Sequence, residues 1–315
     1  MMTRWSGLGV LLAAVLLGAC GKSEAPPAAQ EPRFDAAFLM DNDIWREQRR
    51  ETLLAADGWA SLVGLHWLEL KAHYVGSGST SGIRLALGPP RLGLVTRENN
   101  AYWFTPEPGV QVQVDGKAIK GRIPLRADDQ AEPTIIAFDD GKGALSLIHR
   151  GPRYALRVKH ADAPARTGFG QLEYWPADPA WRIKARFVPH DVGKTLPVVD
   201  ITGLSSEQAN AGAVEFERDG RTWRLEALGE PGEPLLVIFA DRTSGRGSYA
   251  AGRYIDLQVP DARGEVVIDF NRAYNPPCAF TPFATCPLPP PENRLDLPVQ
   301  AGEKAYAKPG NGVHA

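Results

Sequence analysis

Glycine and proline interrupt this 315-residue sequence throughout, with 32 glycines and 27 prolines. Both residues break helices and mark turns, so this frequency excludes a helical bundle and favours short strands joined by many turns. The segments between the turns are short apolar runs, for example residues 110–114, 154–159 and 266–270. Hydrophobic residues make up 43% and charged residues 23% of the chain, which is typical of a globular protein. The sequence therefore predicts a mainly β fold.

The first residues resemble an export signal. Arg4 precedes an apolar stretch, residues 8–19, that is too short to cross roughly 30 Å of hydrocarbon as a helix. The stretch ends in Leu17-Gly18-Ala19-Cys20, which resembles the lipobox of bacterial lipoproteins, whose cysteine is diacylated and becomes the new N-terminus. We expect a lipoprotein signal peptide over residues 1–19 and lipidation at Cys20. The alternative is a soluble secretion signal or a short membrane anchor.

The residues after Cys20 indicate where the protein resides. Gly21 stands where an inner-membrane retention signal has aspartate, so we expect the periplasmic face of the outer membrane, with the lipid on Cys20 as the membrane contact. Residues 20–34, rich in alanine and proline among polar residues, predict a flexible tether. A formal net charge of −2 provides no positive field for nucleic acid, which we exclude as a partner.

One helix precedes the strands. Apolar residues at helical spacing among charged ones predict an amphipathic helix within residues 35–57, ended by Gly58. The spacing then changes to short segments bounded by turn residues. Asp115-Gly116 and Asp219-Gly220 each stand between two such segments and indicate hairpins of antiparallel strands.

The distribution of the strands predicts two β-rich lobes. We expect the helix and the first lobe within residues 35–165, the second lobe within 166–308, and a disordered tail over 309–315. The second lobe contains residues 276–291, called here the proline–cysteine segment, in which seven of sixteen residues are proline. Proline cannot donate to a strand ladder, so this segment is expected to follow an extended, irregular path.

Two cysteines remain when Cys20 is lipidated. Cys278 and Cys286 both lie in the proline–cysteine segment, and an oxidising compartment normally joins such a pair. We expect an intramolecular disulfide. A redox-active pair is disfavoured because the spacing is far from Cys-x-x-Cys, and a metal site because no nearby histidine completes a ligand set. The six histidines of the chain also lack zinc-ligand spacing, so no metal is expected. The phosphate-loop and dinucleotide motifs are incomplete at residues 188–195 and 168–170, so no cofactor is expected either.

Polar side chains gather at the ends of apolar strands in the C-terminal half. They are Asp241, Arg253, Asp269, Asn271 and Asn275. We expect these five residues to line one polar pocket, because polar groups at the ends of buried strands often form sites. The alternative is structural: Asp and Asn bind local amides in turns, and Arg253 pairs with Asp241 or Asp269 to satisfy a buried charge.

Three stretches of the chain resemble a known family. They read SLVGLHWL at residues 61–68, DFNRAYNPPCAFTP at 269–282 and ATCPLPPPENRL at 284–295. Together they are similar to the bacterial family catalogued as domain of unknown function 1684, and the resemblance covers about residues 44–304. It implies no activity, because the family has none assigned.

Two functions therefore stay open, and whether the chain is an enzyme is undecided by its sequence. The first is a binding or structural lipoprotein of the cell envelope with a polar pocket for an unknown small-molecule or envelope ligand, favoured because no complete catalytic motif is present. The second is a periplasmic hydrolase with Asp241 or Asp269 as general base and Arg253 or Asn271 steadying charge. A carboxylate with a raised pKa in a cleft would favour the enzyme.

Overall fold

The computed structural model describes residues 36–307, which fall within one compact unit of the chain. The expected signal peptide, Cys20, the tether and the tail over 309–315 lie outside the described residues. Between residues 36 and 307, no helix combines the length and the apolar character needed to cross a bilayer.

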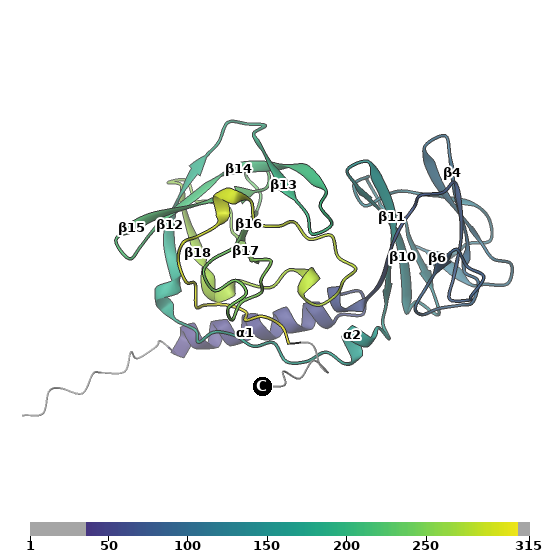
Figure 1. Ribbon diagram of the computed structural model, residues 1–315, viewed down its shortest axis with the longest axis horizontal. Helices are drawn as coiled ribbons and strands as arrows, with labels where there is room; N and C mark the ends of the chain where they lie inside the picture. Colours follow the sequence, from purple (N-terminus) through teal and green to yellow (C-terminus); the bar gives the residue numbers. More distant parts are fainter. Residues whose placement is uncertain (1–35, 308–315) are drawn as a thin grey trace, which may run out of the picture. The chain divides into compact units, whose positions relative to one another are not determined.

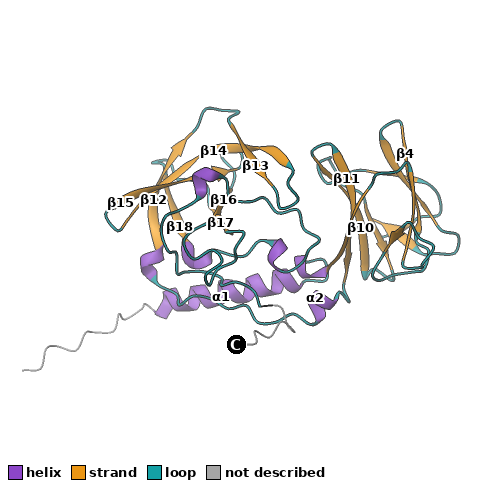
Figure 2. Ribbon diagram, viewed as in Figure 1, coloured by secondary structure: helices purple, strands orange, loops and turns teal. Residues whose placement is uncertain are grey.

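The described residues form antiparallel sheets that follow one long helix in the chain (Figures 1 and 2). Every strand pairing is antiparallel apart from the short parallel pair β2 and β3. The prediction of a mainly β fold with one N-terminal helix is confirmed. How the chain divides into folding domains stays a prediction.

Strands β1 to β11 build the first lobe from two sheets, ordered β1-β11-β10-β9-β6-β7 and β3-β2-β4-β5-β8. Their apolar faces meet in a core that includes Phe104, Ile136, Leu145 and Leu156. The strands are β1 (Leu62–Trp67), β2 (Ala72–Gly76), β3 (Ile83–Arg84), β4 (Gly93–Glu98), β5 (Ala101–Pro106), β6 (Val112–Val114), β7 (Lys117–Ala118), β8 (Ile123–Leu125), β9 (Ile135–Phe138), β10 (Gly143–Arg150) and β11 (Arg153–His160).

Strands β12 to β18 build the second lobe, a sheet ordered β17-β16-β15-β14-β12-β18 with β13 paired to β14. Phe270 packs edge-on against Trp181, Phe216 and Phe239 in its core. The strands are β12 (Arg182–Pro189), β13 (Thr195–Val199), β14 (Ser205–Arg218), β15 (Arg221–Leu228), β16 (Leu235–Phe239), β17 (Arg253–Leu257) and β18 (Glu265–Asp269). Three of the short helices are α2 (Pro164–Thr167), η2 (Pro179–Trp181) and η3 (Phe270–Arg272).

Both hairpins expected from Asp-Gly pairs are confirmed. Asp115-Gly116 joins β6 to β7, and Asp219-Gly220 joins β14 to β15. All four residues have positive φ, between 51° and 71°. A two-residue turn of this kind needs positive φ at both positions, which aspartate and glycine adopt at low cost.

The predicted helix is confirmed as α1 (Ala36–Leu54), which runs along the second lobe in Figure 1. Gly58 follows the helix, as expected, and leads into the 3-10 turn η1 (Trp59–Ser61). A Cβ at position 58 would lie 2.5 Å from the carbonyl oxygen of Leu53, so the chain can fold back here only with glycine. Leu53 itself is fully buried and packs with Phe280 of the proline–cysteine segment.

The proline–cysteine segment contains no strand, as expected, and only the short helix η4 (Pro277–Ala279) and the start of η5 (Pro291–Asn293). Its apolar residues instead pack on other elements. Ala284 and Cys286 lie against Leu62 at the start of β1. The segment therefore fills the space between the helix, the first lobe and the second lobe.

A substitution at Gly252 would test how tightly the proline–cysteine segment is packed. The φ of Gly252 is +95°, and a Cβ there would lie 2.4 Å from Pro289 Cγ and 2.6 Å from the carbonyl oxygen of Phe239. We expect Gly252→Ala to destabilise the protein by more than the roughly 1–2 kcal/mol that left-handed backbone costs an L-residue. Gly232→Ala is the matched control, because its φ is +87° and nothing lies within 4 Å. Equal shifts in the urea midpoint of the two variants would show that the proline contact is loose.

Candidate functional site

The five polar residues expected to form a pocket are all buried. The side chain of Asp241 accepts a hydrogen bond from the backbone N–H of Val299 at 2.6 Å and another from Thr243 Oγ1 at 2.9 Å. Asp269 Oδ1 accepts from the N–H of Asn271 at 3.0 Å, at the start of η3. These carboxylates are occupied by backbone and neighbouring side-chain donors.

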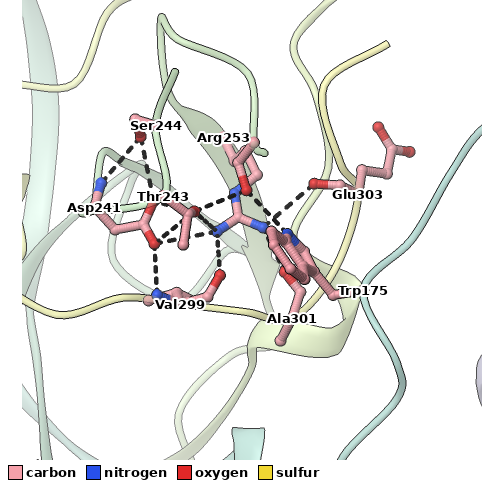
Figure 3. Close-up of polar contacts among 9 residues, drawn as sticks. Trp175, Asp241, Thr243, Ser244, Arg253, Val299, Ala301 and Glu303 are labelled. Atoms are coloured by element: carbon pink, nitrogen blue, oxygen red, sulfur yellow. Dashed lines mark hydrogen bonds and ion pairs between the residues drawn. The ribbon is translucent and has the colours of Figure 1, made fainter. Parts of the chain in front are cut away.

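Arg253 holds the last described segment in place (Figure 3). Its Nη1 donates to the carbonyl oxygens of Ala301 and Glu303, and its Nη2 donates to that of Val299 at 2.9 Å. Its Nη2 also lies 3.5 Å from the carboxylate of Asp241. Burial lowers the pKa of this guanidinium, and the charges of Asp241 and Glu303 oppose that shift. The arrangement matches the structural alternative, in which Arg253 pairs with Asp241.

Asn271 and Asn275 join other pairs of segments. Asn271 exchanges two hydrogen bonds of 2.9 Å with the backbone of Asp178. Asn275 donates from its backbone to Glu303 Oε2 at 2.7 Å and from its side chain to the carbonyl oxygen of Lys304 at 2.7 Å. The structure therefore places the five expected residues in buried anchoring contacts, and none of them lines the cavity described next.

A cavity of about 670 Å³ lies where α1, η1, the end of β10, strands β11, β16 and β17 and the proline–cysteine segment meet. Its volume is within the range of small-molecule sites. Four aromatic side chains line it, namely Trp45, Trp59, Tyr254 and Tyr274. The proline–cysteine segment is the part of its wall that the sequence marks, and the other walls come from elements distant in the chain.

Two arginines on one wall of the cavity share a single carboxylate. Arg150 donates to both oxygens of Asp128, at 3.0 and 2.7 Å, and to Thr285 Oγ1 at 3.2 Å. Arg157 is less well partnered: its Nη1 lies 3.9 Å from Asp128 and its Nη2 3.5 Å from Thr285 Oγ1. Its Nε is buried with no hydrogen-bond partner among the described residues. Two cations and one anion leave this cluster with one positive charge.

Burial has opposite consequences for the two kinds of group in this cluster. It lowers the pKa of Arg157, and the like charge of Arg150 adds to that shift. For Asp128, burial alone would raise the pKa, but hydrogen bonds from Arg150 and from the N–H of His149 outweigh it and lower the pKa. Asp128 is thus ionised at neutral pH, and the guanidinium of Arg157 stays charged because its ordinary pKa is above 12.

A carboxylate lines another wall of the same cavity. Asp256, on β17, is exposed to the cavity and accepts a hydrogen bond from the hydroxyl of Tyr274 at 3.0 Å. The surrounding walls remove water and raise the pKa of Asp256, against the hydrogen bond from Tyr274 and the charge of Arg49. Arg49 also lines the cavity, but its Nε and Nη2 already bind Glu303 at 3.0 Å and the carbonyl oxygen of Asn275 at 2.8 Å.

Cys278 and Cys286 are free thiols in this structure, so the expected disulfide is not formed in it. The backbone N–H of Cys278 donates to Sγ of Cys286 at 3.1 Å, and the hydroxyl of Tyr249 donates to Sγ of Cys278 at 3.6 Å. The hydrogen bond from the Cys286 thiol lowers the pKa of Cys278 to about 7. Among residues 36–307, no group of three or more His, Cys, Asp or Glu side chains is arranged to hold a metal ion.

The disulfide remains a prediction for the protein in an oxidising compartment. We expect intact-mass analysis after alkylation without reductant to find both thiols blocked to the reagent and two hydrogens missing. The closed loop is short, so the bridge would add roughly 2–3 kcal/mol of stability. Full alkylation of both Cys278 and Cys286 in freshly isolated protein would show that the pair stays reduced.

The comparisons with known proteins bear on the second half of the chain. The family model described as "Protein of unknown function (DUF1684)" matches residues 167–304, which confirms the resemblance found in the sequence over that range. This chain is similar to an uncharacterized protein from Haloarcula marismortui whose solution NMR structure is known. The two sequences are 32% identical over a match that covers 44% of this chain and 78% of the other protein, and the TM-score is 0.37. No curated protein matches the sequence.

Proposed function

Residues 167–304 of this chain belong to a family of unknown function, so we propose a function from the cavity itself: the protein binds a small ligand whose anionic group is held by Arg157. The observation that carries the proposal is the buried Nε of Arg157, which has no hydrogen-bond partner among the described residues. A buried donor without a partner costs about 1–3 kcal/mol. An anion that reached this guanidinium would offset that cost.

The charge of the cluster supports the same ligand chemistry. Asp128 neutralises one of its two arginines, and Arg150 has the shorter contacts with it. Hydrogen bonds between charged groups contribute roughly 1.5–3 kcal/mol, more than neutral ones. Arg157 is therefore the cation of the cavity with the most to gain from an added carboxylate or phosphate.

The aromatic walls indicate the rest of the ligand. Trp45, Trp59 and Tyr274 are half-buried and line the cavity. Flat aromatic faces bind apolar or aromatic groups and order them at low entropic cost. We therefore propose an aromatic or apolar body joined to the anionic group, and a binding module as the function.

A hydrolase is the second candidate, favoured by one observation. Asp241 and Asp269, the general bases expected from the sequence, are occupied by backbone donors, whereas Asp256 is open to the cavity and has a raised pKa. A carboxylate of this kind can act as a general base. Hydrolysis of an ester of a bound ligand by the wild-type protein, with loss of that hydrolysis in Asp256→Asn, would support the enzyme.

We keep the cell envelope as the proposed location, with the protein anchored through a lipid on Cys20 at the periplasmic face of the outer membrane. The support is the sequence of the lipobox-like stretch at 17–20. A ligand for the cavity would then come from the periplasm or from the envelope itself.

Lipidation is tested by Cys20→Ala. We expect the variant to lose incorporation of a labelled fatty acid and to leave the membrane fraction, because two or more acyl chains are needed for stable anchoring. Cys278→Ala serves as a control for cysteine replacement outside the signal. A Cys20→Ala protein that still sediments with outer membranes after a high-salt wash would place the anchor elsewhere.

The anion site is tested with two probes that differ in one group. We expect the purified protein to bind N-acetylphenylalanine about tenfold more tightly than its uncharged amide, since one charge-assisted contact is worth at least 1.4 kcal/mol. Arg157→Gln should abolish that preference in calorimetric titrations. Arg242→Gln, at an exposed arginine paired with Asp296, is the control and should bind like the wild type. Equal binding of acid and amide by the wild-type protein would refute the proposal.

A further inference from the structure

We propose, on the basis of the proposed anion site, that the ligand of this cavity is a zwitterion whose amine binds Asp256 while its anionic group binds Arg157. Free amino acids and short peptides have this chemistry. The inference follows from the charge on the two walls of one cavity: Arg157 lies on β11 of the first lobe and Asp256 on β17 of the second.

Asp256 has unused capacity to bind a cation. Among residues 36–307 no ion pair involves Asp256, and the one hydrogen bond to its side chain comes from Tyr274 to Oδ1. An ionised carboxylate offers about four lone-pair sites on its two oxygens. The second oxygen, Oδ2, therefore remains available to a ligand that reaches it from the cavity.

The groups around Asp256 favour a cation over a second anion. Leu236 is its neighbour on β16 and carries no charge, while Tyr274 faces it with a hydroxyl and an aromatic ring. Arg49 is the charged group near it on α1, and its charge is already matched by Glu303. The guanidinium of Arg49 already covers the ring of Tyr274, 4.6 Å from its centroid, so an ammonium group here would gain mainly the carboxylate.

The limited solvation of the Asp256 carboxylate also favours a cation as its partner. The walls that surround the carboxylate remove water and raise its pKa, so its ionised form lacks full solvation. A cation of the ligand would restore that lost stabilisation. A metal ion fits less well, because Ca²⁺ takes six to eight oxygen ligands and the described residues near Asp256 offer one carboxylate.

Three probes of nearly the same size distinguish the contribution of the ligand's carboxylate from that of its amine. Phenylalanine carries both charges, N-acetylphenylalanine carries the carboxylate alone, and phenylalanine amide carries the amine alone. We expect the wild-type protein to bind phenylalanine about tenfold more tightly than either of the others, since each charged contact is worth at least a factor of ten. Calorimetric titration of the purified protein at neutral pH measures all three.

Two variants test which residue binds the amine and which binds the carboxylate. Asp256→Asn should bind phenylalanine no better than N-acetylphenylalanine and should keep the preference for N-acetylphenylalanine over its uncharged amide. Arg157→Gln should bind phenylalanine no better than phenylalanine amide. Asp43→Asn, at an exposed aspartate of α1, is the matched control for loss of a negative charge. Thermal melts of each variant establish that it folds.

The outcomes separate this inference from the proposal on which it rests. If N-acetylphenylalanine binds the wild-type protein as tightly as phenylalanine does, the amine is not recognised, and the zwitterion is wrong while the anion site stands. If the carboxylate gives no advantage in any probe, the anion site itself is wrong. If none of the three probes binds at about 10 mM, the binding free energy is weaker than about −3 kcal/mol, and both the anion site and the zwitterion are contradicted.

Discussion

The ion pair between Arg49 and Glu303 joins the first helix to the last described segment, and the cavity walls depend on it. Glu303 is fully buried, with one carboxylate oxygen 3.0 Å from Arg49 Nε and the other accepting the N–H of Asn275 at 2.7 Å. Burial raises the pKa of Glu303, and Arg49 opposes the shift. A buried carboxylate without its partner costs several kcal/mol, so helix, turn and C-terminal segment are ordered together.

The cavity forms where the Arg49–Glu303 ion pair holds α1 beside the C-terminal segment. Trp45 and Arg49 of α1 face it from one side, and Pro277 and Thr285 of the proline–cysteine segment face it from another. Because prolines remove ladder hydrogen bonds from that segment, side chains satisfy part of its backbone. The hydroxyl of Tyr254, for example, donates to the carbonyl oxygen of Pro287 at 2.7 Å, and Thr281 Oγ1 accepts the N–H of Phe283 at 3.2 Å. Arg253 does the same for residues 299–303.

Local signals in the sequence were sufficient for much of the fold. The hairpins at Asp115 and Asp219 follow from two adjacent residues, and the end of α1 follows from Gly58. The candidate site was harder, because polar residues at strand ends also serve to anchor backbone that lacks a ladder. Asp241 and Arg253 do this, through their contacts with the backbone of Val299. Arg157 and Asp256 were not foreseen, since each is one charged residue in an ordinary strand and gains meaning only from partners distant in the chain, such as Asp128 and Tyr274.

In the proposed site, Arg157 keeps a donor, its Nε–H, for a ligand. Its Nε–Hε group gives its own signal in a proton–nitrogen correlation spectrum, which Arg157→Lys would assign. On titration with N-acetylphenylalanine, this signal should move toward the position of a charged hydrogen bond and saturate, while that of exposed Arg242 stays in place. A signal of Arg157 that does not respond while the ligand binds elsewhere on the protein would contradict the claim.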